Sequence, residues 1–359
     1  MSRYKRYLDV DVLTAAKQRL NHIFDTHDSV AVMFSGGKDS LATLHLTWEV
    51  AQERGMSQVA AVFRDEELIP DPVLDTVNHY RTEVPWCRLI YYAVPLASHK
   101  FILGKVIPYV QWDPGRPHLR EVPPWAVTLA PGDTRVFDQY NFDGYAAAEF
   151  AGKVAFLTGI RAQESLMRYR ASVNKLNDSY INASSDKRVS LCKPIYDWLE
   201  DDVFKFFMER DIHFCDLYQA QHLAGVNLRV STPLHAEAAK RFGALREWAP
   251  TFYQQVVELF PEILVQERYW AEFDQTKARE RYAQDFDGVR AYILEHIDDE
   301  KTQHAALTRL EGIEKRERVR PGSYPPDYVL NYFMAGSFKR ELIAKWRPEE
   351  ERVVLDGAR

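Results

Sequence analysis

The sequence predicts an α/β protein with a mostly parallel, doubly wound sheet and a helical C-terminal extension. Short apolar runs alternate with amphipathic helical patterns from the N-terminus onward, which is the rhythm of β-α-β units. A glycine-rich string directly follows the first apolar run and leads into a helical pattern. From about residue 233 onward the pattern is almost entirely helical. We therefore expect a core domain over residues 1–230 and a helical extension over residues 231–359.

The first half of the predicted sheet alternates helices and strands. Residues 11–28 repeat apolar side chains at helical spacing, which predicts an amphipathic helix. Residues 29–34, Ser-Val-Ala-Val-Met-Phe, are an apolar run that predicts a buried strand, and the helix after it is expected to end near Gly55. The further elements of this half are a strand at 59–63, a helix at 71–83 and a strand at 89–94.

A proline-rich and aromatic insertion interrupts this rhythm at about residues 104–147. Inside a compact domain such a segment is usually a lid, a binding loop or a packed excursion. Its Trp112 and Trp125 would either stack on an adenine ring or fill the core of the insertion. The elements predicted after it are a strand at 153–158, a polar surface loop at 172–189 and a helix at 199–210.

Composition and charge exclude several classes of protein. The hydrophobic share of 46% is that of a globular chain, and the 46 basic and 52 acidic residues give a net charge of −6, which argues against binding nucleic acid through overall charge. No apolar stretch is long enough to span a bilayer and no signal core follows the N-terminus, so we expect no membrane association and a cytoplasmic location. Cys87, Cys192 and Cys215 form no C-x-x-C pair, so neither a disulfide scaffold nor an iron–sulfur cluster is expected.

The most specific motif is the string Ser-Gly-Gly-Lys-Asp-Ser at residues 35–40, between a predicted strand and a predicted helix. Its glycines allow a tight turn and a close approach to an anion, and the N–H groups of a helix N-terminus favour phosphate. The alternative is a purely structural turn that caps the helix and binds no ligand. Val32 stands where a Walker A loop needs a glycine, which excludes that loop. The expected phosphate ligands are Ser35, Gly36, Gly37, Lys38 and Ser40, with Asp39 as the candidate Mg²⁺ ligand.

A second cluster follows the strand predicted at 153–158, where residues 158–165 read Thr-Gly-Ile-Arg-Ala-Gln-Glu-Ser. Three arginines at the carboxyl end of a strand could clamp phosphate or sulfate oxygens, whereas standing alone they would suit a solvated basic helix face. Glu164 is expected to orient the arginines rather than to act as a base. The candidate residues of this cluster are Gly159, Arg161, Glu164 and Arg168, with Arg170 beside them.

These motifs resemble a known superfamily. The string at residues 35–40 is similar to the pyrophosphate loop of the adenine nucleotide α-hydrolases, which bind the β,γ-pyrophosphate of ATP and cleave between its α- and β-phosphates. The second cluster and the string Lys-Pro-Ile-Tyr-Asp-Trp at 193–198 narrow the resemblance to the phosphoadenylyl sulfate reductase family, over roughly residues 28–220. The resemblance implies the same fold and the use of ATP, or a related adenine nucleotide, with Mg²⁺.

The chain also departs from those reductases. They carry a cysteine nucleophile in a Glu-Cys-Gly tail, whereas no cysteine follows Cys215 here. After the second strand they often have an Asp-Thr-Gly type of turn. This chain keeps only the acid, Asp65, as a candidate nucleotide contact. Residues 227–233 read Asn-Leu-Arg-Val-Ser-Thr-Pro. With the earlier motifs, this string gives a closer resemblance, reaching about residue 265, to a group of bacterial and phage reductase-like proteins, and that resemblance implies a ParB-like protein partner.

Two further signals are weaker. His213, Cys215 and His222 have no recognisable zinc spacing, so core or surface roles are favoured over a metal site. The basic run at residues 315–320 is diluted by neighbouring glutamates, which favours a salt-bridged helix end over a nucleic-acid contact.

We therefore expect an ATP-binding enzyme that cleaves the α–β phosphate bond and adenylylates an acceptor substrate, which is unknown. Lys38, Arg161 and Arg168 would stabilise the charge that develops on the phosphates. Two alternatives stay open at this point. One is a sulfonucleotide enzyme that uses an external thiol, and the other is a nucleotide-sensing regulatory or defence protein without fast turnover.

Overall fold

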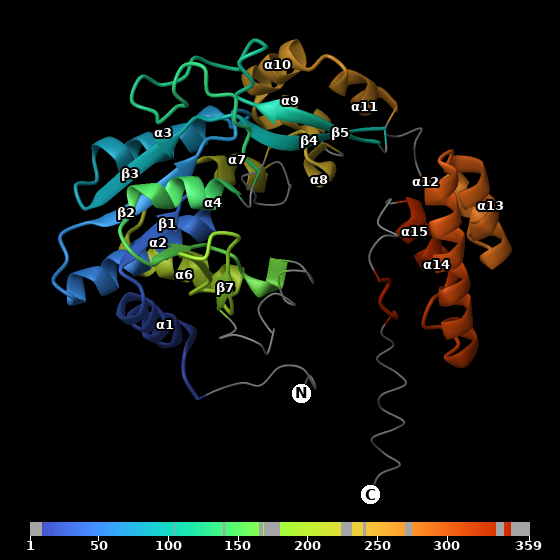
Figure 1. Ribbon diagram of the computed structural model, residues 1–359, viewed down its shortest axis with the longest axis horizontal. Coiled ribbons are helices and arrows are strands. Elements are labelled where there is room, and N and C mark those ends of the chain that lie inside the picture. The colour runs from blue at the N-terminus through green and yellow to red at the C-terminus, as the bar shows by residue number, and fades with distance from the viewer. Residues whose placement is uncertain are drawn as a thin grey trace, which may run out of the picture. The chain divides into compact units, whose positions relative to one another are not determined.

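The computed structural model describes most of the chain (Figure 1). The described residues are 9–103, 105–138, 141–164, 168, 180–223, 232–239, 242–269, 275–334 and 341–345. They form two compact units. Unit 1 comprises Met1–Phe101 and Val106–Leu264, and unit 2 comprises Ile102–Lys105 and Val265–Arg359.

Unit 1 is built on a mostly parallel sheet, as the sequence predicted. The described residues form six strands in the order β3-β2-β1-β6-β8-β7. Neighbouring strands pair in parallel, with Ala31 opposite Ala60 between β1 and β2 and opposite Phe156 between β1 and β6. Only β7, at one edge, runs antiparallel to its neighbour. The strands are β1 (Ser29–Met33), β2 (Val59–Arg64), β3 (Cys87–Tyr92), β6 (Val154–Leu157), β7 (Ile181–Ala183) and β8 (Val189–Cys192).

Helices cover both faces of the sheet, because successive strand residues point to opposite faces and both sets are apolar. Val32, Phe63 and Leu157 belong to a core that they share with helices on one face, whereas Ala31 and Phe156 pack with α4 on the other. The fold is therefore doubly wound, which confirms the predicted fold class. The helices are α1 (Val12–Thr26), α2 (Lys38–Glu53), α3 (Asp71–Thr82), α4 (Asn141–Ala146), α6 (Glu200–Arg210) and α7 (Leu217–Leu223).

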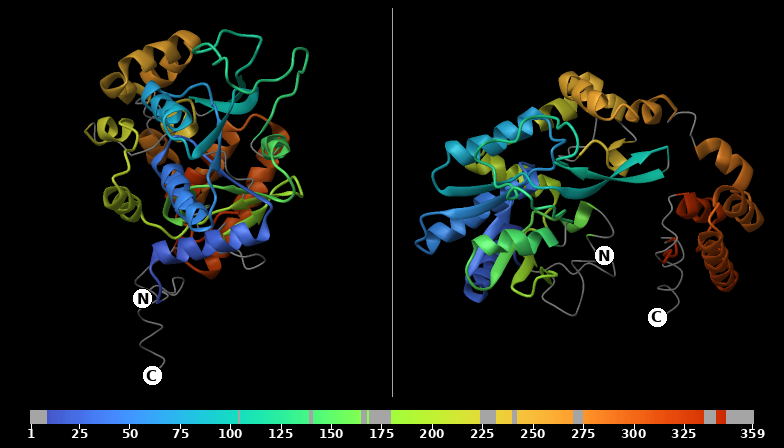
Figure 2. Two further views of the ribbon diagram at one scale, coloured as in Figure 1. Left: turned by 90° about the vertical axis from the view of Figure 1, so that its left-hand side faces the viewer. Right: turned by 45° about the horizontal axis from the view of Figure 1, so that its top comes forward.

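The insertion is more regular than its composition indicated. It contains β5 (Lys105–Gln111), which pairs with β4 (Leu96–Ile102) as a separate two-stranded ribbon, and it ends in α4. Short helices follow residue 230 and pack against this region through Leu234, Phe242 and Val256 (Figures 1 and 2). This apolar cluster explains why unit 1 reaches Leu264, whereas the sequence placed the domain boundary at residue 230. The helices are α8 (Ala236–Ala239), α9 (Leu245–Trp248), α10 (Pro250–Leu259) and α11 (Ile263–Tyr269).

The regular structure of unit 2 is helical in its described residues, apart from the few residues of the β4–β5 ribbon that belong to it. Asp285 and Asp299 cap two of its helices by accepting hydrogen bonds from backbone N–H groups, at 2.7 and 2.8 Å. Val289, Leu310 and Val329 lie in its apolar core. Among the helices that the structure describes, none is both long and apolar enough to cross a bilayer. The helices are α12 (Gln275–Tyr282), α13 (Phe286–His296), α14 (Glu300–Val319) and α15 (Pro326–Met334).

Candidate functional site

The topology of the sheet singles out the carboxyl ends of β1 and β6. From β1 the chain adds β2 and β3 on one side, and it then returns to add β6 and β8 on the other. In doubly wound sheets, ligands bind in the crevice where the order of strands reverses in this way. The glycine string follows β1 and the arginine cluster follows β6, so both predicted motifs meet at this position.

The loop after β1 has a conformation that requires glycine. Gly36 has a φ of +73°, and a Cβ built on it would lie 2.8 Å from the Cγ1 of Val73 in α3. Two hydroxyls hold the turn: Ser40 Oγ donates to the Gly37 carbonyl at 2.9 Å and lies 3.0 Å from Ser35 Oγ. Gly37 is the N-cap of α2. It has no side chain to cap the helix, so it does not block a ligand from the N-terminus of α2.

The two loops are in direct contact. A Cβ on Gly159 would lie 2.5 Å from the backbone carbon of Asp39 and 2.6 Å from the nitrogen of Ser40. Only glycine therefore allows the loop after β6 to lie against the first turn of α2. This contact brings together Gly159 and the glycine string.

Three charged side chains link the loops. Arg161, which is only 3% exposed, donates from Nε to Asp39 Oδ1 at 2.7 Å. The Nζ of Lys38 lies 3.5 Å from the other oxygen of Asp39 and 3.1 Å from a carboxylate oxygen of Glu200. Two buried cations thus face one carboxylate at the switch point, with Glu200 at the rim of the site. An anion with several oxygens could replace these carboxylates as their partner.

Glu164 and Arg168 lie at the edge of this cluster. Glu164 pairs with Arg168, whose side chain is 45% exposed, and it also accepts a hydrogen bond from the backbone N–H of Arg161 at 3.4 Å. These contacts support the expectation that Glu164 orients the arginines. Ser165 and Arg170 lie outside the described residues.

Three residues that contribute to the candidate site were not predicted from the sequence. Gln163 accepts hydrogen bonds from Arg161 Nη1 at 3.2 Å and from the backbone N–H of Glu200 at 3.3 Å, so it joins the arginine loop to the start of α6. The hydroxyl of Tyr218 accepts a hydrogen bond from the backbone N–H of Lys38 at 2.8 Å. Gln163 and Glu200 lay inside recognised motifs, whereas Tyr218 is 180 residues from Lys38 and had no motif to mark it.

Asp65 has a different environment from the one expected. It is fully buried beyond β2, where one oxygen accepts from Arg120 at 2.6 Å and the other accepts from the hydroxyl of Tyr91 at 2.6 Å. Trp112, also buried, donates from its indole nitrogen to the Asp65 carbonyl. Both oxygens of Asp65 are thus engaged by the protein itself, and Trp112 is buried in the main apolar core of unit 1.

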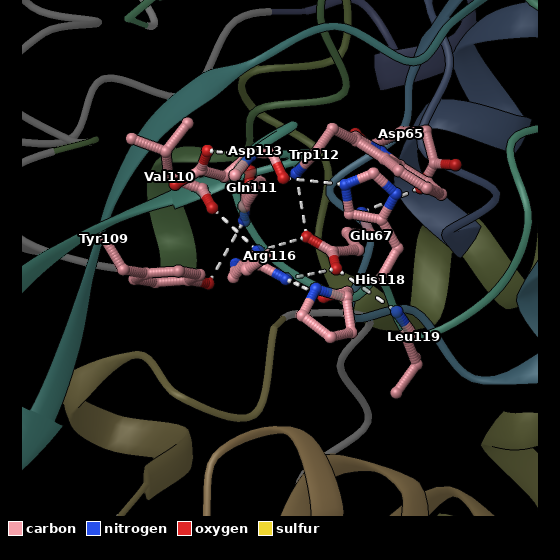
Figure 3. Close-up of polar contacts among 12 residues, drawn as sticks. Asp65, Glu67, Tyr109, Val110, Gln111, Trp112, Asp113, Arg116, His118 and Leu119 are labelled. Atoms are coloured by element: carbon pink, nitrogen blue, oxygen red, sulfur yellow. Dashed lines mark hydrogen bonds and ion pairs between the residues drawn. The ribbon is translucent and has the colours of Figure 1, made fainter.

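Glu67 forms the centre of the same network (Figure 3). It is fully buried and accepts hydrogen bonds from Arg116 at 2.7 and 2.5 Å, and from the backbone N–H of Trp112 at 2.8 Å. The two carboxylates thereby anchor residues 112–120 of the insertion to the end of β2. Trp125, by contrast, is 47% exposed and lies under the guanidinium of Arg81.

The residues present offer little to hold Mg²⁺ on their own. In the described part of the chain, no group of three His, Cys, Asp or Glu side chains could hold a metal ion. Asp39, the expected ligand, has both oxygens directed at cations, so it does not fit a metal in this arrangement. His213 is exposed and pairs with Asp216, whereas Cys215 is buried and donates to the Pro72 carbonyl.

The basic run at residues 315–320 is paired with acidic side chains, as the sequence predicted for a helix end. Arg316 lies 2.9 Å from Glu341, and Arg318 lies 3.7 Å from Glu314.

The three cysteines are all buried, and no described hydrogen bond joins their thiols to Lys38, Asp39 or Arg161. Burial raises the pKa of the Cys87 and Cys192 thiols to about 12 and also raises the pKa of the Cys215 thiol. The thiolate is the nucleophilic form of cysteine. These thiols are therefore poorly suited to nucleophilic chemistry near neutral pH.

A doubly wound sheet with a glycine loop and buried cations at its switch point defines a nucleotide-binding type of α/β fold. Comparison of sequences identifies the family, since residues 29–263 match the model of the phosphoadenosine phosphosulfate reductase domain. The chain belongs to this family, which confirms the resemblance found in the sequence.

A curated relative is an uncharacterized protein, YbdN, of Escherichia coli (strain K12). The two are 30% identical over 261 residues, which are 68% of this chain and 62% of the relative. The chain therefore spans less than two thirds of the length of that relative.

Solved structures with some similarity include three proteins. FMN adenylyltransferase of Candida glabrata, in complex with FMN and an ATP analogue, is 13% identical with a TM-score of 0.39, covering 60% of this chain and 61% of that one. Phosphoadenylyl-sulfate reductase of Candida auris is 13% identical with a TM-score of 0.35, covering 61% and 90%. The U34-tRNA thiolase NcsA of Methanococcus maripaludis is 17% identical with a TM-score of 0.33, covering 72% and 78%.

Proposed function

We propose that this protein binds ATP at the switch point and cleaves its α–β phosphate bond, transferring the adenylyl group to an acceptor and releasing pyrophosphate. The observation that carries the proposal is that two buried cations, Lys38 and Arg161, lie beside the glycine loop and both face Asp39. A cation held in a buried position interacts strongly with a phosphate because water screens it little.

The roles of the residues follow from their positions. The loop at residues 35–40 would hold the β- and γ-phosphates through backbone N–H groups, with Lys38 as the counter-charge. Arg161, directed across the crevice from the β6 loop, would stabilise the charge that develops as the α–β bond breaks. Arg168, at the exposed edge, would contact the part of the ligand farthest from α2. Such chemistry depends on positioning and charge, so it needs no nucleophilic side chain.

The cysteines favour this proposal over thiol chemistry by the protein itself. A sulfonucleotide reductase needs a reactive thiolate, and the three buried thiols have raised pKa values. Mg²⁺ would enter as the complex with ATP, and we assign no catalytic step to it.

The test compares Lys38→Ala with Lys17→Ala, whose lysine forms only partly exposed ion pairs with Glu49 and Glu53 on α2. With Mg²⁺, ATP and candidate acceptors, Lys38→Ala is expected to lower the rate of pyrophosphate release by about 10²–10³-fold, the loss typical of removing one preorganised charge or donor. Lys17→Ala is expected to behave as the wild type. Melting temperatures verify that both variants are folded.

Undiminished turnover in Lys38→Ala would show that the site lies elsewhere. Tight binding of a non-hydrolysable ATP analogue, without pyrophosphate release for any acceptor, would reject adenylyl transfer and favour a nucleotide sensor.

A further inference from the structure

Tyr218 brings a hydroxyl to the first turn of α2 from a distant part of the chain. It lies on α7 and is 3% exposed. Its oxygen is 2.8 Å from the backbone nitrogen of Lys38, from which it accepts a hydrogen bond. The ammonium of Lys38 lies 5.3 Å from the centre of the tyrosine ring, within range of a cation–π contact. Tyr218 therefore contacts both the backbone and the side chain of the central lysine.

The hydroxyl has one hydrogen for which the described part of the chain shows no acceptor. A tyrosine hydroxyl donates one hydrogen bond and also accepts. Its acceptor role is used by Lys38. None of the residues that the structure describes accepts the hydroxyl hydrogen within hydrogen-bond distance. A buried donor without an acceptor costs about 1–3 kcal/mol, so an acceptor supplied by a ligand would be favourable here.

Tyr218 is held in place and stays protonated. Its ring belongs to the main core of unit 1 and lies 6.4 Å from the ring of Phe214. Burial raises the pKa of the phenol well above its usual value, so the group is a donor at neutral pH. A rigid, neutral donor at the mouth of a helix complements phosphate oxygens, which are acceptors only.

We propose that the Tyr218 hydroxyl donates a hydrogen bond to a phosphate group bound at the N-terminus of α2, and so acts as a direct ligand-binding residue of the site. The ligand is a polyphosphate, either inorganic pyrophosphate or the phosphates of a nucleotide. This inference rests on the proposed function for the location of the phosphate. It adds a neutral hydrogen-bond donor, contributed by α7, to the cations Lys38 and Arg161.

The test is the affinity of Tyr218→Phe for inorganic pyrophosphate and for a non-hydrolysable ATP analogue, measured by calorimetry. The variant keeps the ring and loses only the hydroxyl. We expect binding to weaken by about 10-fold, because a hydrogen bond to a charged group is lost. The matched control is Tyr80→Phe, which removes another buried hydroxyl of the same core, one that contacts His45. This control is expected to bind both ligands as the wild type does.

The dependence of affinity on salt distinguishes the loss of a direct hydrogen bond from a displacement of Lys38. Loss of a neutral donor should weaken binding equally at 0.05 and 0.5 M NaCl, whereas movement of Lys38 would also reduce the dependence of affinity on salt. Lys38→Ala provides that reference. Unchanged or tighter binding by Tyr218→Phe, together with weak binding by Lys38→Ala, would overturn the inference and leave the proposed function standing. If the wild-type protein binds neither ligand, the proposed function fails as well.

Discussion

Glu200 competes with a ligand for Lys38. Its carboxylate lies 3.1 Å from the ammonium, and its side chain is 44% exposed, so it can turn away into solvent. A phosphate that binds Lys38 must replace it. Lys38 is thus paired with a group that is easily displaced, whereas Asp39 is held firmly by Arg161.

We expect Glu200→Gln to tighten the binding of pyrophosphate by up to about 5-fold, because the ligand no longer displaces a competing charge. The gain is modest since a half-exposed ion pair contributes only about 0–1 kcal/mol. Asp201→Asn is the matched control, because it removes the same charge from the same turn of α6 without a described contact to Lys38. Calorimetry in low salt measures the effect, and weaker binding by Glu200→Gln would give Glu200 a positive role in recognition.

At the scale of elements, the insertion is fixed to the sheet by buried charge. Arg116 binds both oxygens of Glu67, which is fully buried and has a φ of +61°. Arg120 binds one oxygen of Asp65 and also donates to the Glu67 carbonyl. Removal of one member of such a pair leaves an uncompensated charge in the interior, which is costly.

We expect Arg116→Ala to lower the free energy of unfolding of unit 1 by about 3–5 kcal/mol. Neutralising the orphaned acid in the double variant Arg116→Ala/Glu67→Gln should recover part of that loss. Arg54→Ala breaks a more exposed pair with Asp25 and should cost under about 1 kcal/mol. Chemical denaturation gives the values, and equal losses for Arg116→Ala and Arg54→Ala would contradict the anchoring role.

The sequence predicted the elements whose patterns are strong. The strands β1, β2, β3 and β6 and the helices α1, α3 and α6 agree with their expected ranges to within a few residues. It missed the β4–β5 ribbon because the prolines in the insertion suggested irregular structure, although Pro108 lies within β5. It also missed β7 and β8, which are only three and four residues long. β7 lies inside the polar stretch at 172–189 that was expected to be a loop, and β8 begins at its last residue.

The candidate site could be predicted only where it depends on strand ends. Parallel strands bring their carboxyl ends to one edge, so the loops that hold Lys38 and Arg161 had to lie close together. The environment of Asp65 could not be foreseen, because its partner Arg120 comes from the insertion. The contact of Tyr218 with Lys38 could not be foreseen either, because the position of Tyr218 depends on how α7 packs against the core.

At the scale of the whole molecule, the three cysteines are distributed through unit 1 with no shared site. With a pKa of about 12, the thiols of Cys87 and Cys192 are ionised only to the order of 10⁻⁴ at pH 8. A rise in pH increases the thiolate fraction, but it stays small throughout the neutral range. Thiol chemistry on a substrate would therefore require a thiol from outside the chain.

We expect the triple variant Cys87→Ala/Cys192→Ala/Cys215→Ala to release pyrophosphate at a rate within about 3-fold of the wild type. Its stability should fall by about 1 kcal/mol for each buried thiol removed. Pyrophosphate release and melting temperature, measured on the same samples, separate these effects. A folded triple variant that binds nucleotide but has no turnover would show that one of the three thiols is catalytic.

The order of the strands also determines where this fold can accommodate inserted segments. β3 lies at the sheet edge and β6 next to β1, so the chain must travel past β2 and β1 to continue. That long crossover accommodates a ribbon, a buried charged network and a helix while β1 and β6 keep their register. The loop after β6 has no such freedom, because Gly159 lies against Asp39. Relatives with different acceptors should therefore differ in the length of the crossover and agree in the length of the two loops.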